Sequence, residues 1–164
     1  MTSLISATFK TKLAAHEALT TLEALGVTQE QLSVIVTDET RGNSFNIETH
    51  SKADEGAAAG ATAGGIVGAV LASLATASAI AIPGVNLVVS GALVSAFAGL
   101  GAGAATGGLV GALIGAGISE HEAKIYEDQI KNGSVLIAVK PEDGEQHEKI
   151  KTALEQQDAY NIAA

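Results

Sequence analysis

The four histidines are the side chains of this chain best suited to binding a metal or transferring a proton. They are His16, His50, His121 and His147, and no two of them are three or four residues apart. Two ligands on one helix face need that spacing, so a metal site would require distant segments to converge. The chain has no cysteine, which excludes thiolate metal sites and thiol catalysis. The sequence therefore predicts no metal site.

Acidic residues occur in close groups of the kind that can supply general acid and base catalysis. The groups are Glu120 with Glu122, Glu127 with Asp128, and Glu142 with Asp143 and Glu145. They fall at predicted helix starts or on predicted exposed faces, where a negative charge favours the helix dipole. We therefore predict no catalytic residues and no enzymatic activity.

Glycine-rich runs can bind phosphate, and the chain has two short ones at residues 99–103 and 115–117. Neither contains the Lys that a Walker loop requires, and both follow apolar predicted helix, whereas a dinucleotide loop follows a strand. The sequence therefore predicts no nucleotide and no other cofactor.

These glycines belong to an uncharged block that runs from Gly56 to Ser119 between two charged regions. Its only strong interruption is Pro83-Gly84, with Asn86 after it, which predicts two apolar helices joined by a tight turn at residues 83–86. Small residues recur at every fourth position in both arms. They are Gly56, Gly60, Gly64 and Gly68, then Gly91, Ser95, Gly99, Gly103, Gly107, Gly111 and Gly115.

Residues four apart share one face of a helix, so each arm carries a groove with almost no side chain. Each interior Gly costs a helix about 1 kcal/mol relative to Ala, which indicates a compensating contact. Small residues in register let two helix backbones approach closely. We interpret the pattern as a glycine zipper, a surface for helix packing within and between chains.

The charged regions 1–55 and 120–164 predict one small α+β domain. Alternating apolar residues predict four strands, at Ser3–Phe9, Gln31–Thr37, Ser134–Lys140 and Ala159–Ile162. Caps and apolar stripes predict three helices, starting at Thr11, Ser119 and Asp143. The second start is a capping box of Ser119 and Glu122. The polar stretch Asp38–Glu55 is predicted to be a loop.

This order of elements fits a ferredoxin-like, split β-α-β domain. The helical hairpin of residues 56–119 enters between its second and third strands. We expect helices to cover one face of the sheet. The other face would be open, or covered by the hairpin, by the helix that follows it, or by a second copy of the chain.

The sequence at residues 117–126 and 133–139 resembles a bacterial family of heat-induced and general stress proteins, which has low-temperature-induced relatives in cyanobacteria. The resemblance rests on an Ile-Pro-Gly turn, here residues 82–84, and on a helix bearing Glu122, Ala123 and Tyr126. The usual Pro after Gly-Ile is replaced by Ser119. The resemblance implies expression under stress, with no accepted enzymatic activity and no agreed ligand.

The net charge of −9 lies entirely outside the uncharged block, which argues against nucleic acid and against a basic contact with anionic lipid. The predicted arms, about 40 Å and 48 Å long at the rise of a helix, are long enough to span a bilayer. Both charged regions would then lie on the cytoplasmic side. Against this, Phe97 is the only aromatic residue of the block, so no aromatic belt marks a membrane interface.

The sequence leaves three functions open. The first is a non-enzymatic stress-type protein whose hairpin inserts into membrane lipid and self-associates. The second is a cytoplasmic protein that assembles into a ring, sheet or filament by burying hairpins between subunits, since a lone monomer would expose a large apolar surface. The third is a ferredoxin-like domain that binds a small ligand.

Overall fold

The computed structural model describes residues 3–37, 80–82, 87–91, 94, 103–157 and 159–163. The loop predicted at Asp38–Glu55 and the turn predicted at Pro83 and Gly84 lie outside these residues. The described elements, in chain order, are β1 (Ile5–Phe9), α1 (Lys12–Ala24), β2 (Leu32–Thr37), β3 (Ile80–Ile82), β4 (Leu87–Gly91), α6 (Gly103–Gly115), α7 (Glu120–Lys131), β5 (Val135–Val139), α8 (Gly144–Glu155) and β6 (Asn161–Ala163).

The three helices predicted from their caps are present, and each begins where its capping side chain stands. The hydroxyl of Thr11 accepts a hydrogen bond from the backbone N–H of Ala14 at 3.2 Å. Asp143 accepts one from Gln146 N–H at 2.7 Å and opens α8. These bonds satisfy N–H groups that have no partner inside the helix.

The strands form one antiparallel sheet in the order β3-β4-β2-β5-β1-β6. The four strands predicted from alternation are β1, β2, β5 and β6, and β5 lies between β1 and β2. The register is fixed on both sides of β5, since Val139 lies opposite Ile5 on one neighbour and opposite Leu32 on the other. The α+β class is therefore confirmed.

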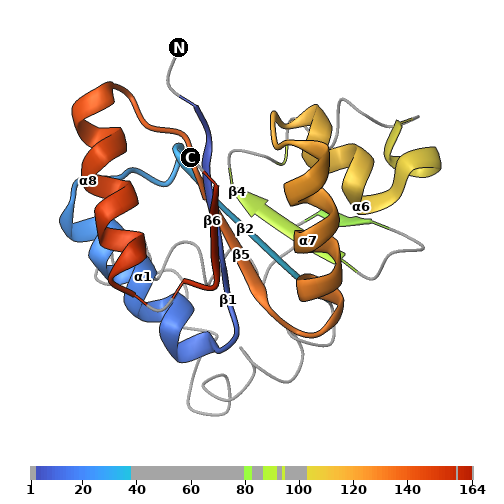
Figure 1. The fold of residues 1–164 in the computed structure, drawn as a ribbon, viewed down its shortest axis with the longest axis horizontal. Coiled ribbons are helices and arrows are strands. Elements are labelled where there is room, and N and C mark those ends of the chain that lie inside the picture. The colour runs from blue at the N-terminus through green and yellow to red at the C-terminus, as the bar shows by residue number, and fades with distance from the viewer. Residues whose placement is uncertain are drawn as a thin grey trace, which may run out of the picture.

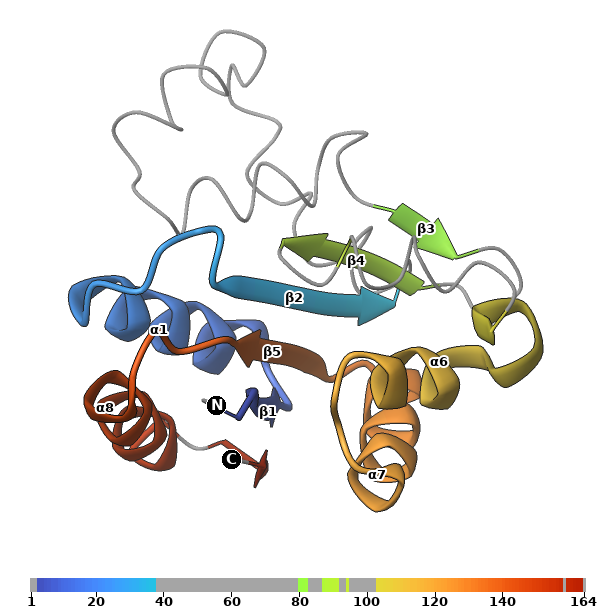
Figure 2. The same cartoon turned by 90° about the horizontal axis from the view of Figure 1, so that it is seen from above.

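Helices cover both faces of the sheet (Figures 1 and 2). The α1 and α8 layer packs on one face, over Phe9, Val34 and Ile137. The α6 and α7 layer packs on the other face, over Ile35 and Leu136. The helix that follows the uncharged block therefore covers the second face, one of the possibilities that the sequence left open.

The prediction of helix on both sides of residues 83–86 is wrong. Ile80–Ile82 and Leu87–Gly91 are strands that pair antiparallel with each other, and β4 also pairs with β2. Both segments are rich in Ile and Val, whose branched side chains favour a pleated sheet over a helix. Pairing with β4 also satisfies the backbone groups along one edge of β2, which would otherwise be open.

Candidate functional site

The structure describes five of the predicted helix-packing residues. Gly103, Gly107, Gly111 and Gly115 lie in α6, and Gly91 is the last residue of β4. The remaining predicted positions are outside the described ranges. They are Gly56, Gly60, Gly64, Gly68, Ser95 and Gly99.

The assignment of Gly91 to a helix-packing groove is wrong. Its φ of +97° lies in the left-handed region, and a Cβ built there would lie 2.1 Å from the carbonyl oxygen of Leu32. Glycine is needed here because β4 runs against the backbone of β2 at Ser33, its partner in the register. The spacing of one small residue at every fourth position therefore includes Gly91 only by coincidence.

Helix α6 has one face in the core and one at the surface. Leu109, Ala112 and Leu113 are fully buried among residues of β2, β5 and α7. On the outward side, Ile114 is 43% exposed and Gly115 is exposed. The sequence of α6 contains no charged residue on either side. Its outward face is therefore an uncharged surface of small and aliphatic residues.

A kink at Gly108 limits how far the glycine groove can run along α6. Gly108 has φ 57° and ψ −151°, which are not helical values. The helix axis changes there, so Gly103 and Gly107 precede the kink while Gly111 and Gly115 follow it. We define the outward surface of α6 as Gly111, Ile114 and Gly115, the residues that share one uninterrupted helical segment.

A short connection carries the chain from α6 into α7. Gly117 has φ +98° and Ile118 is buried, so the chain turns at the end of α6 and returns to the core. The capping box predicted at Ser119 and Glu122 is present, with Glu122 N–H donating to Ser119 Oγ at 3.3 Å and Ser119 N–H donating to Glu122 Oε2 at 3.4 Å. The box fixes the direction in which α7 crosses the sheet.

Polar side chains connect α7 to β1 beneath it. The hydroxyl of Tyr126 donates to the carbonyl oxygen of Ser6 at 3.2 Å and lies 3.1 Å from Ser6 Oγ. Thr8 Oγ1 donates to Gln129 Oε1. We call these two interactions the β1–α7 polar contact. Sequence reasoning missed this contact, although the alternation of β1 could have indicated it. If Ile5, Ala7 and Phe9 share one face, then Ser6 and Thr8 must share the other.

Burial raises the pKa of Tyr126 above its ordinary value of 10.0, and the hydrogen bond with Ser6 only partly opposes this shift. The unfolded chain loses the phenol proton at lower pH than the folded chain does. The contribution of Tyr126 to the free energy of unfolding should therefore be complete below about pH 10. It should fall as pH rises from there toward the pKa of the folded state. Urea unfolding at about pH 9 and about pH 11 measures this loss, and Tyr126→Phe should reduce it. An equal loss in both proteins would contradict this assignment.

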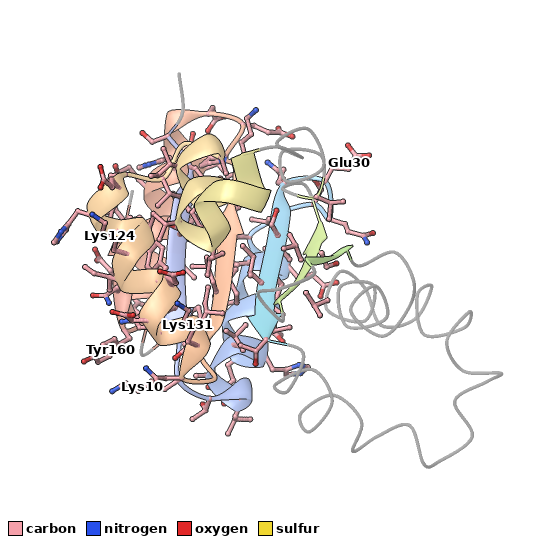
Figure 3. All side chains as sticks on the ribbon, turned by 90° about the vertical axis from the view of Figure 1, so that its right-hand side faces the viewer. Lys10, Glu30, Lys124, Lys131 and Tyr160 are labelled. Carbon is pink, nitrogen blue, oxygen red and sulfur yellow. The ribbon has the colours of Figure 1, made fainter. Side chains whose placement is uncertain are left out.

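The acidic groups considered for catalysis lie on α7 or at the start of α8, and one member of each group pairs with a lysine one turn away. Glu120 lies 2.7 Å from Lys124, Glu127 lies 3.1 Å from Lys131 and Glu145 lies 2.6 Å from Lys149. The hydrogen bond from Lys124 lowers the pKa of Glu120. Figure 3 faces the α6 and α7 layer and shows Lys124 and Lys131 along α7. Pairs of this kind contribute little to stability because water screens them.

The described histidines do not come together. His16 and His121 are exposed on different helices, and His147 Nδ1 lies 3.6 Å from Glu148 on α8. His50 lies outside the described ranges. Within the part of the chain that the structure describes, no three His, Cys, Asp or Glu side chains are grouped so as to hold a metal ion. Lys10 Nζ lies 3.9 Å above the ring of Tyr160, an exposed cation–π pair (Figure 3).

Among the described helices, none combines the length and the apolar character needed to cross a bilayer. Comparisons of the chain with protein-family models, with curated proteins and with solved structures gave no match.

Proposed function

We propose that this protein is non-enzymatic and acts by self-association, with the outward surface of α6 as the contact between copies. The observation that carries the proposal is the second half of the helix, residues 109–115, which is apolar on all sides although only Leu109, Ala112 and Leu113 are fully buried there. A helix that is apolar on all sides is ordinarily a buried helix. The outward surface of α6 therefore requires a partner whose surface is also apolar.

A second copy of the chain meets this requirement. Gly111 and Gly115 bring almost no side chain to the surface, so a second helix backbone can approach closely beside Ile114. The net charge of −9 lies outside residues 56–119, so the charged elements can remain in water while uncharged segments meet. The product would be an assembly of identical subunits, such as a ring, sheet or filament in the cytoplasm.

Membrane lipid is the second candidate partner, because no residue from Gly56 to Ser119 carries a charge. In this alternative the uncharged block inserts into the bilayer and the charged regions lie on the cytoplasmic side. The strand at Leu87–Gly91 shortens the second predicted arm, which began at Leu87 and was expected to be one helix. Self-association of the protein is therefore the better supported of the two.

We further propose that residues 1–55 and 120–164 form a ferredoxin-like unit into which residues 56–119 are inserted. The order β2-β5-β1-β6 supports this, because it places the third strand between the first and the second and the fourth beside the first. The same element order and the residues quoted above support kinship with the heat-induced and general stress proteins. In such a protein, association would be the response to stress.

Light scattering on a size-exclusion column tests self-association directly. The parent protein in detergent-free buffer should elute as a multimer. Ile114→Asp should shift it to the monomer mass, because an aspartate in the contact between copies would be desolvated without a partner. Leu13→Asp is the matched control, since Leu13 is 68% exposed on α1 and belongs to the opposite layer. It should leave the mass unchanged.

Two results would contradict the proposal. A parent that is monomeric at all concentrations would exclude self-association, and an Ile114→Asp variant with the parent's mass would exclude α6 as the contact. Flotation with neutral phosphatidylcholine vesicles separates the second candidate. A monomeric parent that floats with these vesicles would identify lipid as the partner.

A further inference from the structure

The two faces of the sheet differ in polarity. Toward α1 and α8 the strands β1, β2, β4 and β5 present aliphatic and aromatic residues, with Ser90 as the exception. Toward α6 and α7 the same strands present three buried polar residues, Ser6, Thr8 and Ser33, which the register places on one face with Leu136 and Ala138. The α6 and α7 layer therefore lies on the more polar face.

This difference lowers the cost of separating α7 from the sheet. Tyr126 and Gln129 bond to Ser6 and Thr8 across the contact. When such groups are released, water replaces each lost hydrogen bond, so one bond contributes only about 1 kcal/mol net. An aliphatic contact has no such replacement and loses its full burial. The α1 and α8 layer, which packs on the aliphatic face, is expected to be the harder one to release.

The ends of α7 suit it to move as a unit with α6. Gly117 precedes it with φ +98°, and Gly133 follows it with φ +90°. Chain direction therefore changes at both ends through glycines, which adopt a wide range of backbone conformations. The residues between these points carry the capping box of α7, which a movement of the whole layer leaves intact.

Release would change what α6 offers to a partner. In the docked state only its outward surface is available, while Leu109, Ala112 and Leu113 are buried against the sheet and α7. After release from the sheet, these residues would join Ile114 on a helix that is apolar on all sides. Such a helix is unstable when it is exposed to water. A second copy of α6 can supply an apolar surface in place of the sheet from which the helix was released.

We infer that α6 and α7 form a releasable layer, and that its departure from the sheet adds the inward face of α6, packed against the same face of a second copy, to the contact made by the outward surface. The β1–α7 polar contact holds the layer in its docked state. This inference deepens the proposed function and rests on it, because it names a docked state with low affinity and a released state with high affinity for another copy.

Hydrogen exchange on the dilute parent protein tests release separately from association. Amides of α6 and α7 should exchange through openings that leave α1 and α8 protected. Tyr126→Phe and Gln129→Met each remove one member of the β1–α7 polar contact. Each should raise the equilibrium constant for opening of the α6 and α7 layer about fivefold. The matched control is Thr21→Ala, which removes the 3.2 Å hydrogen bond that Gln157, two residues beyond the end of α8, donates to Thr21 of α1. It should leave exchange in α7 unchanged.

Because both copies must open before their inward faces can meet, the same variants should associate at about 25-fold lower protein concentration, measured by light scattering over a dilution series. Exchange of α6 and α7 only together with α1 and α8 would overturn the releasable layer. Faster exchange without a change in association would also overturn the inference, while loss of assembly in Ile114→Asp would still support the proposed function. A parent that never associates, yet opens this layer first, would overturn the proposed function and with it the role assigned to release.

Discussion

Replacement of Gly91 by alanine is expected to destabilise the protein by about 2 to 5 kcal/mol. Two costs combine at this position. The φ of +97° is unfavourable for any residue with a Cβ, and that Cβ would lie 2.1 Å from Leu32 O and 2.8 Å from Ser33 Cα. These neighbours are backbone atoms of a buried strand, so they cannot rotate away as a side chain can. The pairing of β4 with β2 must give way.

The measurement is urea unfolding followed by circular dichroism, with Gly26→Ala as the matched control. Gly26 has a similar φ of +82°, but a Cβ there meets no atom within 4 Å. The free energy of unfolding of Gly26→Ala should fall only by the cost of placing a Cβ in the left-handed region, about 1 to 2 kcal/mol. The difference between the two variants isolates the steric contact of β4 with β2. Equal losses in both would contradict the close approach of these strands.

Replacement of Leu113 by alanine is expected to cost about 2 to 5 kcal/mol. Leu113 is fully buried between α6 and the sheet, in the same cluster as Ile35 and Leu136. Its removal leaves a cavity in the α6 and α7 layer and loses the burial of the side chain. The same urea titration measures this loss.

The neighbouring residue provides the control. Ile114→Ala removes a side chain of similar size from the outward side of α6, where 43% of the residue is exposed. At protein concentrations low enough to keep the chain monomeric, its effect on the free energy of unfolding should be within about 0.5 kcal/mol. A loss in Ile114→Ala as large as that in Leu113→Ala would contradict the two faces assigned to α6, and with them the surface proposed for association.

Sequence patterns predicted the regular part of this fold well because the signals there are local. Alternation predicted β1, β2, β5 and β6, and caps at Thr11, Ser119 and Asp143 predicted the helices that follow them. Each of these signals depends on neighbours within one or two turns or strand repeats. The α+β class followed from their order.

The strands β3 and β4 were missed because more positions in the uncharged block favoured helix than favoured strand. Small residues at every fourth position favoured helix throughout the uncharged block, while only short Ile and Val segments favoured strand. What decides the structure of β4 is the edge of β2, which is distant in the sequence and offers backbone groups to pair, and β3 in turn pairs with β4. A pattern within one segment carries no information about such an edge.

The candidate surface was predicted only in part. The spacing identified Gly111 and Gly115, but the direction they face depends on which side of α6 takes the core. That choice is made by Leu109, Ala112 and Leu113 against β5 and α7. The kink at Gly108 was also unpredictable from spacing, since the helical groove was expected to continue through it.

The position of β5 in the sheet has a consequence for how the chain folds as it is synthesised. Among the described strands, β1 pairs with β5 and β6, and both of these follow residues 56–119 in the chain, so β1 has no strand partner until those residues have been synthesised. Contacts between such distant residues slow folding. During this interval the uncharged residues 56–119 are already exposed to other chains. Nascent chains of this protein are therefore expected to need chaperone binding, most of all when the rate of synthesis exceeds the rate of folding.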